Sequence, residues 1–87
     1  MLLHFVVFTL NHCAEGRAAQ ACLEDARGRA TYEVINLDAH PDVVEELQYR
    51  LQRAGRPCSM TGIRMPQIFC EDRARSEYVA GLRQQLE

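Results

Sequence analysis

The sequence lacks the features that would place a protein in a membrane or on nucleic acid. Its first apolar run, residues 2–9, is far shorter than the roughly 20 residues that a membrane-spanning helix needs. No Lys or Arg precedes this run, so the basic start of a secretory signal peptide is missing. A formal net charge of −2 gives no basic footprint for nucleic acid. We therefore expect a cytoplasmic protein that binds neither membrane nor nucleic acid.

The four cysteines lack the spacing of a metal site or of a disulfide framework. They include no C-x-x-C pair, and the three histidines supply no paired ligand spacing. Structural disulfides are also rare in the reducing cytoplasm. The sequence therefore predicts no metal, and each cysteine has to be interpreted separately. The four positions are Cys13, Cys22, Cys58 and Cys70.

What the sequence does contain is an alternation of strand-like and helix-like segments. Residues 2–9 form a continuous apolar run, typical of a strand that is covered on both faces. Residues 31–38 are rich in β-branched and aromatic side chains and predict a second strand. A short strand is predicted at 67–70, followed by a turn with a minimal edge strand at 73–75.

Three helices complete the pattern. The first starts at Ala14, capped by Asn11 or His12, and ends at Gly28. Small residues at helical spacing give it a predicted buried face of Ala14, Ala18, Ala21 and Cys22. The second opens at Pro41, and its predicted apolar stripe is Val43, Val44, Leu47, Leu51 and Ala54. The third starts near Ser76, with a predicted face of Val79, Leu82 and Leu86.

The predicted order is therefore βαβαββα in one domain, residues 1–87. The first two strands should be parallel, because a strand–helix–strand unit crosses over on one side of a sheet. A three-layer α/β/α sandwich around a mixed four-stranded sheet accounts for every element.

Three segments resemble the glutaredoxins, a family with the thioredoxin fold. They are "VVFTLNHC" (6–13), "YEVINLDAHPD" (32–42) and "MPQIF" (65–69), and the resemblance covers essentially the whole chain. It implies a thioredoxin-like fold, Cys13 at the position of the nucleophile, and a cis peptide bond before Pro66. It also implies thiol–disulfide exchange with glutathione mixed disulfides as the activity.

The chain departs from the glutaredoxin pattern in several places. Gly16 stands at the second cysteine of the C-x-x-C motif, which leaves one candidate thiol, and the pattern is not the "CGFS" form linked to iron–sulfur clusters. Leu10 stands where the family often has a lysine, and Arg64 where it has a threonine. The run "SEYV" (76–79) replaces the turn that holds a carboxylate of glutathione.

The C-terminal half is also similar to the SH3-domain-binding glutamic-acid-rich-like proteins, which share the fold and lack the catalytic cysteine. The similarity lies in "MPQIFCEDRARSEYVAGL" (65–82), in its length and in the positions of its acid, arginine and tyrosine residues. It implies an alternative function, a non-catalytic module that binds a protein partner in the groove around Pro66. Their proline-rich SH3-binding stretch has no counterpart in "GIRMP", so SH3 binding is not implied.

Cys13 is the predicted nucleophile for a second reason, its place at the start of a helix. Unpaired backbone N–H groups and the positive end of the helix dipole favour a thiolate there. Arg17 and His12 add positive charge nearby, whereas Glu15 and Glu24 oppose it. The alternative is a small residue that fills a turn and performs no chemistry.

The other predicted site residues follow from the resemblance. Cys58 is either a resolving thiol for Cys13 or a loop cysteine without a redox role. Cys22 is predicted to lie in the core, and a disulfide between Cys58 and Cys70 under oxidation is left open. The predicted contacts to glutathione or to a peptide are Arg64, Met65, Pro66, Ser76 and Glu77.

Overall fold

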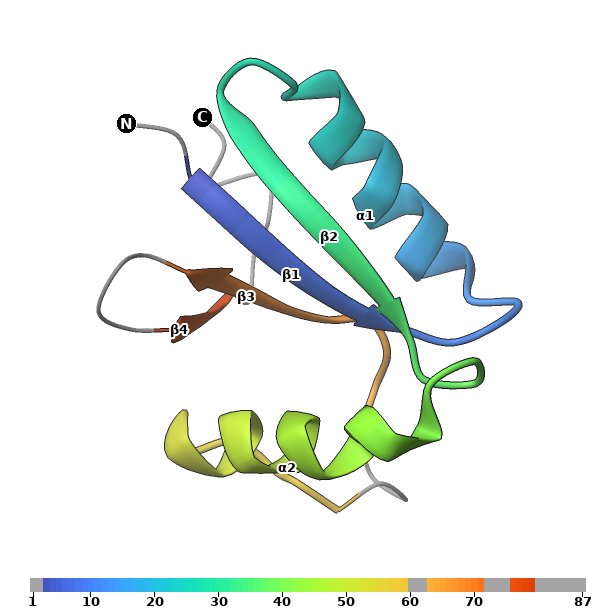
Figure 1. Ribbon diagram of the computed structural model, residues 1–87, viewed down its shortest axis with the longest axis vertical. Coiled ribbons are helices and arrows are strands. Elements are labelled where there is room, and N and C mark those ends of the chain that lie inside the picture. The colour runs from blue at the N-terminus through green and yellow to red at the C-terminus, as the bar shows by residue number, and fades with distance from the viewer. Residues whose placement is uncertain (1–2, 60–62, 72–75, 80–87) are drawn as a thin grey trace.

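A four-stranded mixed sheet forms the centre of the molecule (Figure 1). The structure is a computed structural model that describes residues 3–59, 63–71 and 76–79. Strand β1 pairs in parallel with β2 and antiparallel with β3, and β3 pairs antiparallel with β4, in the order β2-β1-β3-β4. This mixed sheet confirms the predicted fold class. The strands are β1 (Leu3–Thr9), β2 (Ala30–Asn36), β3 (Gln67–Glu71) and β4 (Ser76–Val79).

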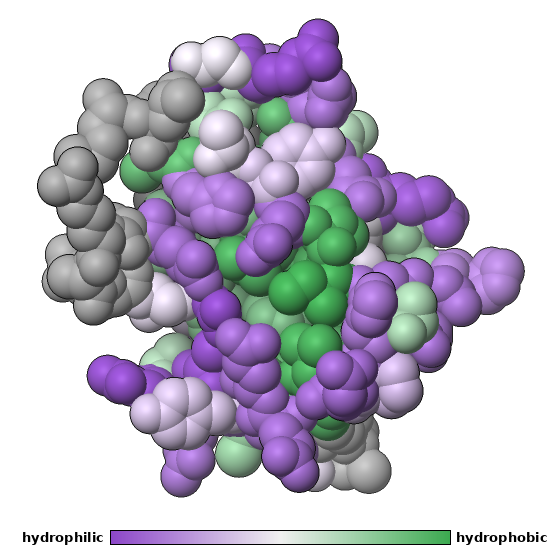
Figure 2. Space-filling view, in the orientation of Figure 1, coloured by the Kyte–Doolittle hydropathy of each residue, from purple (hydrophilic) through white to green (hydrophobic). Residues whose placement is uncertain are grey.

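Two helices cover opposite faces of this sheet. Helix α1 (Ala14–Asp25) packs Leu23 against one face, and α2 (Val44–Arg53) packs Leu47 and Leu51 against the other. Alternate residues of β1 enter the core on the α1 side and the core on the α2 side, and the residues of both sets are fully buried. This two-sided burial explains why the apolar run of β1 is unbroken. Figure 2 shows hydrophobic side chains gathered in a band between the two helices and polar side chains around it.

The register of the sheet brings three chain segments to one edge. Thr9, the last residue of β1, pairs with Asn36, the last residue of β2, and Phe8 pairs with Gln67, the first residue of β3. The loop that leads to α1 therefore leaves the sheet at the edge where the segment before Gln67 enters it. The candidate site is built at this edge.

The buried face of α1 differs from the prediction. The structure buries Gly16, Ala19 and Leu23, whereas the small residues that were expected inside are exposed, apart from a half-buried Cys22. The physical reason is that Leu23 has far more apolar surface to bury than any alanine, so it sets the orientation of the helix.

The prediction of a helix starting at Ser76 is wrong, because Ser76–Val79 is strand β4. Pairing with β3 buries Val79 and places the Tyr78 ring edge-on to Phe69, with centroids 5.9 Å apart. These contacts outweigh any helical preference of so short a segment. The predicted strand at 73–75 and the predicted helical residues 80–87, including Leu82 and Leu86, lie outside the described residues.

Helix α2 follows a 3₁₀ turn, Pro41–Val43, which confirms that Pro41 opens this helical segment. Its predicted stripe is buried at Leu47 and Leu51, while Ala54 is exposed. In the described part of the chain, no helix is long and apolar enough to cross a membrane. Among the same residues, no group of three or more His, Cys, Asp or Glu side chains could hold a metal ion.

Arg50 ties α2 to the sheet. Its guanidinium donates to Glu71 of β3 at 2.6 Å and to Glu46 at 3.1 Å. The guanidinium carbon also lies 5.5 Å from the ring centroids of both Phe8 and Phe69. Since this side chain is only 17% exposed, the contacts act in a partly desolvated setting and hold the α2 layer in place.

Candidate active site at the start of helix α1

Cys13 is the N-cap residue of helix α1. Its backbone is extended (φ −99°, ψ 103°), and its sulfur accepts a hydrogen bond from the Gly16 N–H at 3.3 Å. A serine, threonine, aspartate or asparagine oxygen usually takes this role. The prediction that Asn11 or His12 caps the helix is therefore wrong. His12 lies in the preceding turn, with φ 58°.

Gly16 allows the first turn of α1 to lie directly on the end of β1. A Cβ at this position would overlap Thr9 Oγ1 and would lie 3.2 Å from Thr9 Cβ and 3.3 Å from Cys13 Sγ. Thr9 is itself buried, with 8% of its surface exposed. The missing side chain at position 16 therefore lets the helix approach the strand closely, in the same turn whose N–H binds the sulfur.

Sequence reasoning missed Thr9. The signal that could have revealed it is the combination of two residues: a β-branched residue at the end of a strand and a glycine in the first turn of the helix that follows. Each member is ordinary alone, and their contact depends on how closely the helix crosses the strand.

Hydrogen bonds from the end of β2 fix the loop before Cys13. The Asn11 N–H donates to Asp38 Oδ2 at 2.7 Å, and Asn36 Nδ2 donates to Asn11 Oδ1 at 2.7 Å. The Leu37 N–H donates to the Thr9 carbonyl at 2.9 Å. Polar side chains that follow a strand form such loop contacts readily. Thr9 and Asn11 are thus both bound to the end of β2, which fixes the chain just before Cys13 and the start of the helix.

Cys13 borders an open hollow of about 450 Å³. Cys13 is half-buried, and Arg17, one helical turn later, is exposed. Glu24 lies at the other end of α1, where it accepts a hydrogen bond from the Tyr32 hydroxyl at 2.8 Å that raises the pKa of Tyr32. The expected opposition of Glu24 to a thiolate is therefore absent. The other residues that line the hollow are Thr9, Leu10, Asn11, His12, Gln20, Val34 and Asn36.

The segment before β3 reaches the same edge of the sheet. The Met65–Pro66 peptide bond is cis, and both residues are half-buried. Met65 packs against the core on the α2 side, while Arg64 is exposed. The pairing of Gln67 with Phe8 places Pro66 at the edge from which the Cys13 loop departs. The structure thus brings the predicted residues 64–66 to the end of the sheet where Cys13 lies.

Ser76 and Glu77 lie elsewhere. Ser76 pairs with Glu71, which pairs with His4 near the start of β1, so β4 begins at the opposite end of the sheet from Pro66. The Ser76 hydroxyl accepts a hydrogen bond from Arg50 at 2.9 Å. The strand conformation of this segment explains the difference, since a helix starting at Ser76 was the basis for placing it in the site.

The described structure contains no disulfide, so none of the four cysteines is bonded to another. Cys22 lies nine residues after Cys13, or about 13 Å along a helix, whereas a disulfide needs Cα atoms within about 7 Å. Cys58 packs against the core on the α2 side, and Cys70 packs against the core on the α1 side. The sheet therefore lies between Cys58 and Cys70, and their pairing would need backbone movement.

Comparison with protein-family models matches this chain to Glutaredoxin over residues 5–74. Comparison with curated proteins and with solved structures finds no match, so similarity to the SH3-domain-binding glutamic-acid-rich-like proteins is not shown. The matched region covers most of the chain, including Cys13 and Pro66, and the strand order and the two helix layers agree with a thioredoxin-like fold. The chain therefore belongs to the glutaredoxin family.

Proposed function

We propose that this protein is a monothiol thiol–disulfide oxidoreductase in which Cys13 attacks mixed disulfides of glutathione. The observation that carries the proposal is the hydrogen bond from the Gly16 N–H to the Cys13 sulfur at the start of α1. A backbone N–H and the positive end of a helix interact more strongly with a charged sulfur than with a neutral thiol. The thiolate is the nucleophile in disulfide exchange.

The reaction takes place in two exchange steps. In the first, the Cys13 thiolate attacks the glutathione sulfur of a protein–glutathione disulfide. A bond forms between Cys13 and glutathione, and the substrate protein leaves as a thiolate that takes a proton from water. In the second, the thiolate of another glutathione attacks that glutathione sulfur and releases Cys13. One glutathione thiol is thus consumed for each mixed disulfide: the substrate protein sulfur is reduced to a thiol, and the glutathione released from Cys13 leaves joined to the second glutathione as glutathione disulfide.

The surroundings of Cys13 support the use of an external second thiol. Gly16 stands where a two-thiol glutaredoxin has its second cysteine. Cys22 is too far along α1 to reach Cys13. Cys58 packs on the α2 side of the sheet rather than in the hollow beside Cys13. Its role as a resolving thiol stays a prediction.

Two exposed arginines near this edge of the sheet would contact the carboxylates of glutathione. Arg17 lines the hollow beside Cys13, and Arg64 lies just before the Met65–Pro66 bond. The Met65 backbone would pair with the extended peptide of glutathione, as the family resemblance implies. Ser76 and Glu77 have no part in this arrangement, because they lie at the other end of the sheet.

Glutathione-dependent reduction of a glutathionylated peptide tests the proposal. Wild-type protein should turn over, Cys13→Ser should not, and Cys22→Ser should keep its activity as a matched control on the same helix. Turnover by Cys13→Ser would refute the assignment of the nucleophile. A folded wild-type protein that gives no turnover and no Cys13–glutathione adduct by mass spectrometry would instead favour the non-catalytic interaction module.

A further inference from the structure

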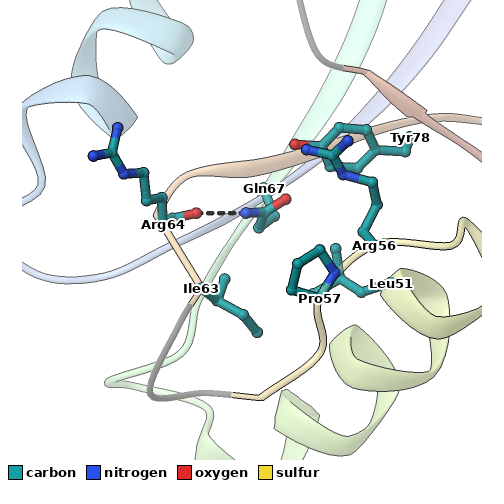
Figure 3. A pocket seen from close by; sticks show the side chains of 7 residues that line it. All are labelled: Leu51, Arg56, Pro57, Ile63, Arg64, Gln67 and Tyr78. Atoms are coloured by element: carbon teal, nitrogen blue, oxygen red, sulfur yellow. Dashed lines mark hydrogen bonds between the residues drawn. The ribbon is translucent and has the colours of Figure 1, made fainter.

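A second hollow, of about 240 Å³, lies beside the segment that precedes Pro66 (Figure 3). Leu51, Pro57 and Ile63 supply its apolar walls. Arg56 and Tyr78 supply a cation and a ring, and Gln67 lies among them. Cys13 does not line it, so this hollow is separate from the one beside the proposed nucleophile.

The Gln67 side chain is held with one polar atom unpaired. It is buried, with 8% of its surface exposed, and its Nε2 donates to the Arg64 carbonyl at 2.5 Å, which fixes the orientation of the amide. Its Oε1 is buried and has no hydrogen-bond partner in the described structure. Figure 3 shows this oxygen turned toward the side where Arg56 and Tyr78 lie. A buried acceptor without a donor is rare, so the hollow is suited to a ligand that brings an N–H group.

Arg56 adds a positive charge to the same hollow. Its guanidinium carbon lies 4.6 Å from the centroid of the Tyr78 ring, a cation–π contact that holds the charge over the hollow. Within the described ranges, Arg56 has no carboxylate partner, whereas Arg27 and Arg50 are each paired with a glutamate. The charge on Arg56 is therefore available to an anionic ligand.

We propose that this hollow binds the C-terminal residue of a peptide or protein partner. The free carboxylate would bind Arg56, the last backbone N–H would donate to Gln67 Oε1, and an apolar last side chain would contact Leu51 and Ile63. A phosphate or an isolated carboxylate would satisfy the arginine alone and leave the glutamine oxygen unpaired. The volume is below that of sites for drug-sized ligands and suits a single residue. Capture of a terminal carboxylate is a recurring mode of peptide recognition.

Arg64, which is assigned above to glutathione, also lines this hollow. The inference is therefore tested on full-length Cys13→Ser protein, in which no glutathione adduct can form at position 13. The probe is N-acetyl-alanyl-leucine, titrated into ¹⁵N-labelled protein and followed by NMR. The backbone amides of Leu51, Ile63 and Gln67 should shift. The same dipeptide with an amidated C-terminus, and the one N-methylated at its last amide, should each bind at least tenfold more weakly. The amide loses the charge-assisted hydrogen bond to Arg56, and the N-methylated dipeptide loses the donor to the buried Gln67 Oε1.

Arg56→Gln should weaken binding of the acid by the same factor. Arg53→Gln is the matched control, because Arg53 also lies over a tyrosine, Tyr49, at 5.8 Å, but does not line the hollow. Equal binding of acid and amide, equal effects of the two arginine variants, or no shift at millimolar dipeptide would each overturn the proposal. Glutathione shifting the same three amides at equal affinity would also overturn it, since glutathione lacks the apolar last side chain.

Discussion

Replacing Gly16 with alanine should destabilise the protein, although alanine is the better helix former. The propensity gain in a helix interior is about 1 kcal/mol. Against it, the new Cβ would overlap Thr9 Oγ1 and lie 3.2 Å from Thr9 Cβ, a residue with 8% exposure and little room to move. Overpacking of this kind costs about 1–3 kcal/mol. The expected net loss in the free energy of unfolding is therefore about 1 kcal/mol.

A double-mutant cycle with Thr9 isolates the contact. Thr9→Ala removes the atom that the new Cβ overlaps, so Gly16→Ala should be neutral or stabilising in that background. Thr9→Val keeps the shape of threonine, so the penalty should remain. The interaction free energy between Gly16→Ala and Thr9→Ala should thus be about 1–2 kcal/mol, well above the ~0.5 kcal/mol expected of independent sites.

Urea denaturation followed by circular dichroism measures these differences, and 1 kcal/mol corresponds to about 4–8 °C in the melting temperature of a domain of this size. A second measurement follows the sulfur. Because the Gly16 N–H binds Cys13, displacing the first turn of α1 should slow alkylation of Cys13, and Thr9→Ala should restore the rate. A Gly16→Ala protein at least as stable as the wild type, or an interaction free energy near zero, would refute the reasoning.

Two further predictions concern the charged groups. Arg50→Met should lower the free energy of unfolding, measured by urea denaturation, by about 2 kcal/mol, because it leaves the partly buried Glu71 without its partner. Arg27→Met breaks an exposed pair and should lower it by less than about 1 kcal/mol. Equal losses for the two variants would contradict this prediction. The raised pKa of Tyr32 arises mainly from its hydrogen bond to Glu24, with smaller contributions from desolvation and from the charge on Glu24. Because the folded pKa is raised, the stabilisation is present below the unfolded value near 10 and is lost as pH rises through the folded pKa. Glu24→Gln should lower the midpoint of the Tyr32 titration, followed by the ultraviolet absorbance of the phenolate. An unchanged midpoint would contradict this prediction.

The parts of the fold that sequence predicted well are those with strong local patterns. The continuous apolar run that includes residues 5–8 is typical of a strand covered on both faces, and Pro41 followed by acidic residues marks the start of a helix. The face of α1 was predicted incorrectly because its residues are mostly small, so one large side chain, Leu23, decides the orientation. Residues 76–79, which form β4, were predicted as the start of a helix because their burial depends on pairing with β3 rather than on their own pattern.

The candidate site was predictable only in part for a similar reason. The place of Cys13 follows from its position between a strand and a helix, which sequence pattern reveals. Its role as the N-cap depends on the turn at His12, and the unpaired oxygen of Gln67 depends on an amide held by the Arg64 carbonyl. Both are results of three-dimensional packing between segments whose individual patterns are unremarkable.

The contact between Thr9 and Gly16 changes the meaning of the missing second thiol. A two-thiol glutaredoxin has a cysteine where this chain has Gly16, and the simplest interpretation is the loss of a resolving group. Here any side chain at that position meets Thr9, so the glycine is also a packing requirement of the first turn of α1. The same glycine donates the hydrogen bond that the Cys13 sulfur accepts. The single-thiol chemistry proposed for this protein and the close approach of α1 to β1 therefore depend on one residue, and restoring a second cysteine would require a change at Thr9 as well.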